Sequence, residues 1–436
     1  MTPINPELYR DAKKFLSDLA ASTDKTGSAI QQDVTEIIDN VKNRGDAAVR
    51  DYSEQFDNIS RETARLSAEE IAGSKPVDAE LMQDLSAAAD NIRAFHKMEL
   101  SQIKNWTMPC DTGTVGQRWS PLRRAGVYIP GGTAAYPSSV LMNVIPAQVS
   151  GVREIALASP PCRETGTVHP LVLAAARLLG ITEIYAVGGA QAVAALAWGT
   201  ETIKPVDTIT GPGNAWVAEA KKQVFGRVGI DSIAGPSEIA VIADSTADPR
   251  LIAADLLSQA EHDTDARVFL LSPDMNTITR SVEELNRQIE TLPRRDIAGR
   301  SVKANGYFMC TGSITEAAEL VNTIAPEHVE VLTADPLDTA RLVKNAGALF
   351  LGSYSCESIG DYWAGPNHTL PTNRTARFSS ALSVRDFIRW TSVIQSQRSS
   401  LEKVYPCIAR LARAEGLEAH ARAVEQRFSD KENYNG

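Results

Sequence analysis

Cysteine is scarce in this 436-residue sequence, which has only five, spread singly between positions 110 and 407. No two of them form a CxxC pair, so the sequence indicates neither a disulfide framework nor a thiolate zinc site. Positive charge is also in short supply: 44 Lys and Arg stand against 54 Asp and Glu, which gives a formal net charge of −10. An acidic chain lacks the basic surface that attracts nucleic acid and anionic lipid. We therefore expect neither as a partner.

Long uninterrupted apolar runs are missing as well. Residues 125–152 carry no charge, but Pro130, Gly131, Pro137 and Pro146 interrupt them, so they cannot form the ~20-residue apolar helix that spans a membrane. The N-terminal residues lack the apolar core of a signal peptide. These absences predict a cytoplasmic protein without membrane contact.

Alternating strand and helix signals fill most of the chain after residue 125. Short apolar runs closed by Gly, Pro or Ser are typical of buried strands, and each is followed by a stretch with helical periodicity. The expected strands are 126–129, 154–158, 183–187, 207–210, 237–242, 267–271, 306–309, 329–332 and 348–351. Repeated units of this kind predict an α/β fold with parallel sheets. We expect two such units, joined near residues 234–236, with largely helical segments before residue 120 and after residue 384.

Turns rich in glycine accompany these expected strands. They lie at 130–132, 187–191, 211–214 and 234–237. None contains GxGxxG at a strand–helix junction, so the usual dinucleotide fingerprint is absent. Small residues at strand ends still favour a bound ligand, but they indicate no particular cofactor.

Histidine is rare enough to be informative, with six in the chain. His96 and His169 lie within or at the start of predicted helices, and we interpret them as structural. The other four each stand near polar groups that can bind a metal or move a proton. These groups are Gln259 with His262, Glu327 with His328, Asp361 with His368, and Glu415 with His420.

Spacing alone supports only part of an assignment. Gln259 and His262 are three positions apart and share one face of a predicted helix. Glu327 and His328 follow a proline turn, a good place to present an acid–base pair. The other two groups lie in a predicted loop and a predicted helical tail. An aspartate, two histidines and an amide oxygen together would suit zinc, but each group could also be an ordinary polar surface.

Eight long motifs together give the sequence a specific resemblance. In chain order they resemble the histidinol dehydrogenase family, from about residue 34 to residue 423. The motifs are VYIPGGTAAYPSSVLMN (127–143), VGGAQAVAALAWGTE (187–201), GPGNAWVAEAKKQVFGRVGID (211–231), AGPSEI (234–239), DLLSQAEHD (255–263), APEHVE (325–330), GDYWAGPNHTLPT (360–372) and EGLEAHARAV (415–424).

The resemblance implies a zinc- and NAD-dependent oxidation of L-histidinol through L-histidinal to L-histidine, the last step of histidine biosynthesis. It implies zinc ligands at Gln259, His262, Asp361 and His420. The residues implied to surround the substrate are Ser237, His328, His368 and Glu415, together with the zinc ligands. The implied NAD contacts are Tyr128, Gln191 and Asn214.

The resemblance also implies a homodimer with shared active sites. The C-terminal arm would cross to the partner, so that Glu415 and His420 complete the neighbouring site. The implied fold is two incomplete Rossmann-like domains with helical arms. The corresponding division is an N-terminal arm at 1–25, a first α/β domain at 26–126 plus 238–383, a second at 127–237, and a dimerisation arm at 384–436.

A division of labour follows from group chemistry. His328 suits the removal of the hydroxyl proton while hydride leaves for NAD. Glu327 is the natural base for the water that must then attack the aldehyde. By resemblance, zinc would hold the substrate by its amino and imidazole nitrogens, and its contribution would be orientation.

Three alternatives are weaker. A family relative acting on another alcohol, such as a sulfonated diol, would need a different pocket, whereas the groups expected to hold histidinol are all present. A metal-dependent hydrolase would need no nicotinamide cofactor. A catalytically silent metal-binding protein would have no need of the Glu327–His328 pair.

Overall fold

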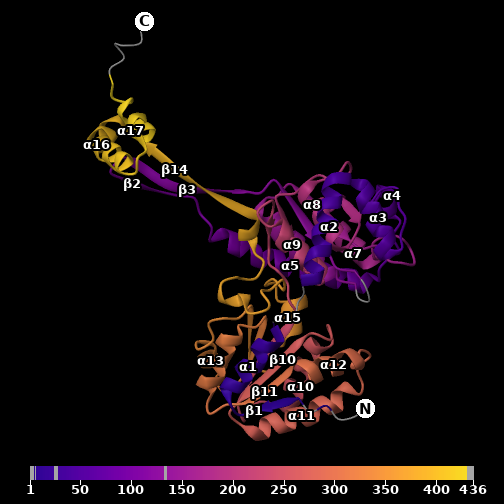
Figure 1. Ribbon diagram of the computed structural model, residues 1–436. Coiled ribbons are helices and arrows are strands. Elements are labelled where there is room, and N and C mark those ends of the chain that lie inside the picture. The colour runs from indigo at the N-terminus through magenta and orange to yellow at the C-terminus, as the bar shows by residue number, and fades with distance from the viewer. Residues whose placement is uncertain (1–3, 5, 24–27, 132–134, 430–436) are drawn as a thin grey trace. The chain divides into compact units, whose positions relative to one another are not determined.

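The computed structural model describes residues 4, 6–23, 28–131 and 135–429. It divides into two compact units. The larger comprises residues 1–100 and 122–387, and the smaller comprises 101–121 and 388–436. The larger unit contains two parallel sheets, here sheet A and sheet B, and the smaller contains an antiparallel sheet (Figure 1).

Sheet A has six strands, and every neighbouring pair in it is parallel. In sheet order they are β1 (Glu7–Tyr9), β11 (Gly306–Cys310), β10 (Arg267–Ser272), β9 (Glu238–Ala243), β12 (His328–Leu332) and β13 (Ala348–Leu351). All residues of β9, β10 and β12 are buried. Strands covered on both faces are continuous apolar runs, which is why the sequence predicted them well.

Helices cover both faces of sheet A. Ile239 and Val241 of β9 pack on one face with α10 (Pro249–Ala260), α11 (Met275–Ile289) and α12 (Arg295–Asn305). Ala240 and Ile242 pack on the other with α1 (Ala12–Thr23) and α13 (Ile314–Ile324). This alternation is the period-2 geometry of a strand. Two short helices, α14 (Pro336–Ala340) and α15 (Glu357–Tyr362), flank β13.

Sheet B has five parallel strands. In sheet order they are β6 (Ile184–Ala186), β5 (Glu154–Ser159), β4 (Arg124–Tyr128), β7 (Thr208–Thr210) and β8 (Gly229–Ile230). The two parallel sheets with their helices confirm the predicted α/β fold class.

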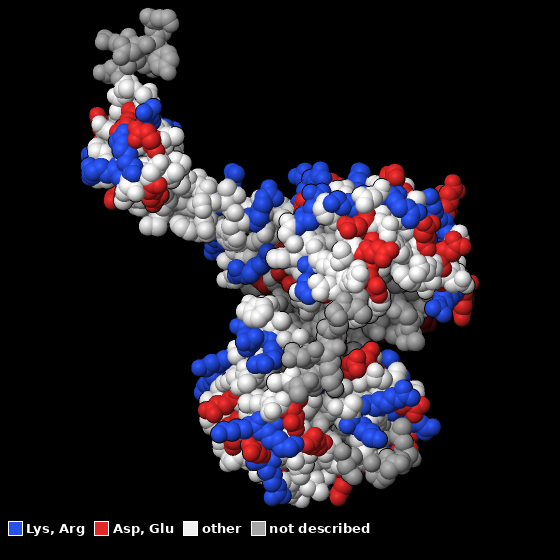
Figure 2. All heavy atoms as spheres, in the orientation of Figure 1, with Lys and Arg blue, Asp and Glu red and all other residues white. Residues whose placement is uncertain are grey.

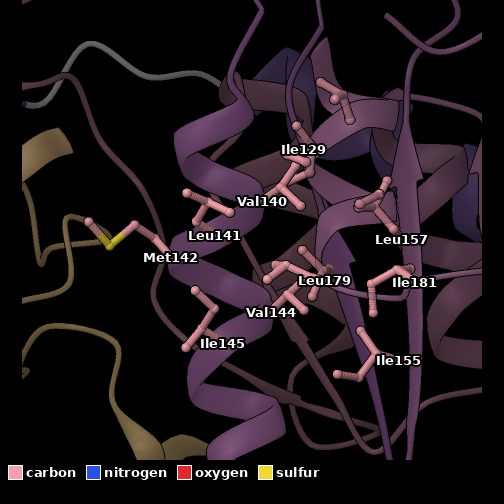
Figure 3. Packing of buried hydrophobic residues seen from close by; sticks show 14 of the residues in the cluster. Ile129, Val140, Leu141, Met142, Val144, Ile145, Ile155, Leu157, Leu179 and Ile181 are labelled. Carbon is pink, nitrogen blue, oxygen red and sulfur yellow. The ribbon is translucent and has the colours of Figure 1, made fainter. Parts of the chain in front are cut away.

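Helices pack on both faces of sheet B. One core joins it to α4 (Ala68–Ala72), α5 (Ala79–Ser101), α6 (Pro137–Ser150) and α7 (Pro170–Leu178). In Figure 3, Val140 and Val144 of α6 point toward the strands, whereas Met142 points away from them. The other core contains α2 (Ser28–Arg44), α3 (Asp46–Asp57), α8 (Gly189–Trp198) and α9 (Ala215–Val224). The domain boundaries at 26, 127, 238 and 384 stay a prediction. They assign α2, α3 and α5 to the domain of sheet A, whereas these helices pack on sheet B.

The predicted N-terminal helical arm begins differently from expectation. Its residues Glu7–Tyr9 form the edge strand β1 beside β11, and the helix starts only at Ala12. Phe15 and Leu19 of α1 are buried in the core of sheet A. A three-residue strand is too short to show periodicity, so no pattern in these residues indicated it.

The smaller unit contains strands that the prediction of largely helical segments before residue 120 and after residue 384 did not include, whereas helices in the tail after residue 397 agree with it. Strands β2 (Trp106–Cys110) and β3 (Gly113–Pro121) form a hairpin, and β14 (Ile388–Ser396) pairs antiparallel with β3. The helices α16 (Arg398–Ala414) and α17 (Glu418–Glu425) follow. Only the first residue of β14 is buried, so its sequence lacks the apolar alternation of a half-buried strand.

Charged side chains of both signs intermingle over the face of the molecule seen in Figure 2. Among the described residues, no helix combines the length and the apolar character that a membrane span requires.

Candidate active site and metal centre

The edge of sheet A at which its strands begin, here the amino edge, holds the predicted acid–base pair. His328 is the first residue of β12, and Glu238 is the first residue of the neighbouring strand β9. The main-chain N–H of Glu238 donates to Glu327 Oε2 at 3.0 Å. Its main-chain oxygen lies 3.0 Å from His328 Nδ1. One residue therefore holds both predicted catalytic side chains.

The turn before β12 lets adjacent residues reach the same partner. Helix α13 ends at Ile324. The next residue, Ala325, has a left-handed backbone (φ 48°), and Pro326 follows. Pro326 fixes its own φ and limits the conformation of the residue before it. Glu327 lies just before the strand begins. Successive side chains within a strand point to opposite faces, but this rule does not apply to Glu327 and His328, so both can reach Glu238.

The contact with Glu238 fixes the tautomer of His328. A carbonyl oxygen only accepts, so Nδ1 carries the proton and Nε2 has the lone pair. Nε2 is buried and has no hydrogen-bond partner among the described residues. Burial, the largest influence, lowers the pKa of His328 to about 4, against the charge of Asp361, which raises it. At neutral pH the ring is a neutral base with an unused lone pair.

Glu327 is buried beside other carboxyl groups. Burial raises its pKa well above the usual range, and the charges of Glu238, Glu357 and Asp361 act in the same direction. The hydrogen bond from the N–H of Glu238 opposes them. The closest approach of Glu327 Oε2 to His328 Nδ1 is 3.8 Å, too long for a hydrogen bond. Once ionised, Glu327 is a strong base for a carboxylate.

Helix α10 brings two predicted zinc ligands to the same region. Asp248 caps its N-terminus by accepting from the N–H of Arg250 at 2.9 Å. Gln259 lies in its last turn and is buried, and His262 follows the helix and is exposed. The charges of His262 and Asp361 both influence the pKa of His328, so the predicted metal and catalytic groups form one cluster.

A potential metal site is formed by three side chains. His262, Glu357 and Asp361 each offer a ligand atom, and these atoms lie within 4.8 Å of one another. Gln259 joins them, because its amide nitrogen, when turned toward Glu357, lies 2.9 Å from Oε2 of that carboxylate. Imidazole nitrogen with carboxylate and amide oxygens is a donor set that zinc accepts. The residues present fit the implied metal.

Glu357 was missed by sequence reasoning. It begins α15, is 2% exposed and lies four positions before Asp361, on the same helix face. That spacing was a usable signal. Burial raises its pKa to about 8, with the charge of Asp361 as the next cause.

His368 joins the cluster through the loop after α15. Its Nδ1 lies 3.1 Å from the main-chain oxygen of Asp361, and its Nε2 lies 3.4 Å from Ser139 Oγ. The neighbouring Asn367 donates to the main-chain oxygen of Met142 at 2.6 Å. The loop is thereby fixed to α6, and burial lowers the pKa of His368. Sequence reasoning did not single out Ser139.

The three predicted NAD contacts lie at the carboxyl end of sheet B. Tyr128 ends β4, and its hydroxyl accepts from the N–H of Gly189 at 3.1 Å. Gln191 follows β6, and its buried Oε1 lacks a hydrogen-bond partner among the described residues. Asn214 follows β7 and caps α9. Residues 132–134, part of the glycine-rich turn after β4, lie outside the described residues.

The remaining predicted site residues are spread over both units. Ser237 immediately precedes β9, and its main-chain oxygen accepts from the N–H of Arg267 at 2.9 Å. Glu415 and His420 belong to the smaller unit, where they lie at the end of α16 and in α17 and are exposed. Their assignment stays a prediction.

The two histidines interpreted as structural have local partners. His96 is buried, with Nδ1 3.0 Å from Glu99 Oε2. His169 caps α7 by accepting from the N–H of Leu171 at 3.2 Å.

The structure is that of an α/β enzyme. It has two parallel sheets, and a buried acid–base pair lies beside a potential metal site.

Residues 20–428 match the family model described as histidinol dehydrogenase. The histidinol dehydrogenase of Geobacillus kaustophilus is 53% identical over 401 residues, which cover 92% of this chain and 94% of the relative. That of Bacillus subtilis is 51% identical over 411 residues, covering 94% and 96%.

A solved structure agrees with these relatives. The histidinol dehydrogenase of Elizabethkingia anophelis is 36% identical, with a TM-score of 0.91 and coverage of 98% of each chain. The chain therefore belongs to the histidinol dehydrogenase family and is an oxidoreductase, which confirms the resemblance found in its motifs.

Proposed function

We propose that the chain oxidises L-histidinol through L-histidinal to L-histidine, with zinc and NAD as cofactors. One observation carries the proposal: the main chain of Glu238 binds Glu327 and His328 together, beside the potential metal site formed by His262, Glu357 and Asp361. Two bases next to a group that holds substrate are what two successive oxidations at one carbon require.

His328 acts in the first oxidation. Its Nδ1–H is engaged by the main-chain oxygen of Glu238, so Nε2 takes the hydroxyl proton of the alcohol. The lowered pKa keeps Nε2 unprotonated at neutral pH. General base catalysis of this kind contributes roughly 10²–10⁴-fold in rate.

Glu327 acts in the second oxidation. The aldehyde must take up water before it can lose hydride, and Glu327 removes a proton from that water. Its carboxylate is held at Oε2 by the N–H of Glu238. The environment that raises its pKa also makes the ionised carboxylate a stronger base.

Gln259, His262 and Asp361 would hold the zinc, with His420 from a second copy of the chain. A bound zinc would orient histidinol by its amino and imidazole nitrogens and retain the aldehyde between steps. Ser237, His368 and Glu415 would complete the substrate pocket. His368 is already oriented by two contacts, from Nδ1 to the main-chain oxygen of Asp361 and from Nε2 to Ser139 Oγ.

NAD would bind at the carboxyl end of sheet B and would supply the hydride acceptor there. Tyr128, Gln191 and Asn214 would contact it. The buried Oε1 of Gln191, which has no hydrogen-bond partner in the described part of the chain, supports a ligand there. Open parallel sheets bind ligands at this end of their strands. The lobe built on sheet B is thus proposed to bind the cofactor, and the lobe built on sheet A the substrate and zinc.

A homodimer with shared sites completes the proposal. Glu415 and His420 are exposed in the smaller unit, as residues that serve a partner's site must be before assembly. We keep the expectation of a cytoplasmic enzyme without nucleic-acid or membrane partners.

The test is the NADH yield from limiting L-histidinol with excess NAD, measured by absorbance. We expect two NADH per histidinol, lost on treatment with a chelator and restored by zinc. A folded, zinc-loaded protein that produces no NADH from histidinol would contradict the proposal and would direct a screen toward other amino and sulfonated alcohols.

A further inference from the structure

Glu357 has contacts that no catalytic role explains. It is 2% exposed, and its carboxylate accepts from Ser258 Oγ at 2.9 Å. Its main-chain N–H donates to Glu330 Oε1 at 2.8 Å. When the Gln259 amide is turned so that its nitrogen faces Glu357, that nitrogen donates to the same carboxylate, with a distance of 2.9 Å to Oε2. Two donors therefore hold the carboxylate, and a separate contact holds the main chain of the same residue.

The contact with Gln259 decides which end of its amide faces the metal site. An amide side chain has an oxygen that accepts and a nitrogen that only donates. A cation can be bound by the oxygen alone. In the opposite orientation the oxygen of Gln259 would face the Glu357 carboxylate, and two acceptors would be in contact. A cation bound beside Glu357 favours its ionised form, and the charge-assisted hydrogen bond from Gln259 to that carboxylate then removes this ambiguity.

We propose that Glu357 is a positioning residue that orients the Gln259 amide so that its oxygen, and not its nitrogen, is presented to the metal. This inference rests on the proposed metal site. It assigns to Glu357 an effect on metal affinity that acts through Gln259. Partners that orient metal ligands typically change metal affinity by about 10–100-fold when they are removed.

The competing role is direct ligation. Glu357 lies within 4.8 Å of His262 and Asp361 by its ligand atom, so it could bind the cation itself. The donors on its carboxylate favour positioning, because Gln259 and Ser258 already occupy it. The two roles predict different behaviour when Gln259 is removed.

A double-mutant cycle separates them. Co²⁺ affinity is measured in competition with a chelator, and binding is followed by the visible absorption of the metal, which does not depend on turnover. We expect Glu357→Leu to weaken Co²⁺ binding about 10–100-fold in the full chain. In the Gln259→Ala background the same change should alter affinity less than about threefold, because the amide it orients is gone.

Ser258→Ala is the matched control. It removes another partner of the same carboxylate but leaves the contact with Gln259, so Co²⁺ affinity should stay within about threefold of the parent chain. Thermal unfolding checks that each variant is folded. If Glu357→Leu does not fold, Glu357→Gln carries the same cycle, with an expected loss of about three- to tenfold that vanishes without Gln259.

The outcomes are distinct. Equal losses in both backgrounds would show that Glu357 binds the metal independently, and would overturn the inference while leaving the proposed function intact. Unchanged affinity in every Glu357 variant would also overturn it. A parent chain that binds neither Co²⁺ nor zinc would overturn the proposed function and this inference with it.

Discussion

Arg267 Nη1 lies 3.1 Å from Glu238 Oε1, and both side chains are buried. The second oxygen of the Glu238 carboxylate accepts from the main-chain N–H of Asn373 at 3.1 Å. This ion pair therefore fixes the residue whose main chain holds Glu327 and His328. It connects the stability of sheet A with the geometry of the acid–base pair.

Replacement of Arg267 by Met should affect stability and both oxidations. Removing one member of a buried ion pair costs about 3–5 kcal/mol, because the other charge is left uncompensated. We expect a loss of this size in the free energy of unfolding, measured with denaturant. The rates of histidinol and histidinal oxidation should both fall, because both bases depend on Glu238.

An exposed ion pair provides the control for this change. Arg341, which follows α14, forms a salt bridge with Asp338 of that helix, and the two side chains are 77% and 63% exposed. Arg341→Met should change stability by less than about 1 kcal/mol and leave both rates as they are. Equal effects of the two substitutions would show that the Glu238–Arg267 pair has no special role.

Single substitutions should separate the two half-reactions. His328→Asn removes the base for the alcohol and should slow the oxidation of histidinol by about 10²–10⁴-fold. Glu327→Gln should chiefly slow the oxidation of added histidinal, because water must be activated only in that step. Rates of NADH formation from each substrate measure both effects. An equal loss in both half-reactions for Glu327→Gln would contradict the division of labour.

His328 should also make the metal-free protein sensitive to acid. Its pKa is lowered to about 4 in the folded state, below the value of about 6.5 in the unfolded chain. Between these values the unfolded state binds more protons, so this contribution to stability is complete above pH 6.5 and is lost as the pH falls to 4. At 1.36 kcal/mol for each pKa unit, the loss is about 3 kcal/mol.

His328→Asn should remove that part of the pH dependence. The difference in unfolding free energy between the parent and the variant is measured by denaturant titration from pH 7 to pH 4. The parent should lose about 3 kcal/mol more than the variant over this range. Parallel curves would mean that His328 titrates near its ordinary pKa and is not desolvated.

The sequence predicted the buried strands of the fold closely and the exposed ones poorly. The expected strand 267–271 corresponds to β10 (Arg267–Ser272), since a strand covered on both faces is an unbroken apolar run. By contrast, β14 is exposed except at Ile388, so burial imposed no pattern on its residues. Its β-branched and aromatic residues, such as Trp390 and Ile394, were the available signal.

The site divides in a similar way. Glu327 and His328 could be found from their adjacency, but the residue that holds them could not. Glu238 holds them with its main-chain N–H and oxygen, and any residue type could make these contacts, so the sequence does not reveal them. It also lies 89 positions from Glu327. The spacing of Glu357 and Asp361 was a usable signal for Glu357, but its contact with Gln259 was not predictable, because Gln259 lies on a different helix and only folding brings the two together.

Complementation between inactive chains tests the shared site. His262 lies in the larger unit and His420 in the smaller one, so the proposal places them on different chains of one active site. His262→Ala and His420→Ala should each abolish activity as homodimers. In a hybrid dimer one site combines both intact residues and the other combines both substitutions. Mixed and reassociated chains should therefore recover activity. Each hybrid dimer should have up to half the activity of a dimer of unsubstituted chains.

The recovered activity must be compared with the fraction of hybrids, measured with chains that carry different affinity tags. A mixture of His262→Ala with Asp361→Asn is the control, because both positions lie in the larger unit and every hybrid site would lack one of them. That mixture should stay inactive at the same hybrid fraction. Hybrids of His262→Ala and His420→Ala that form but remain inactive would mean that each chain supplies its own His420, and the crossing arm would have to be abandoned.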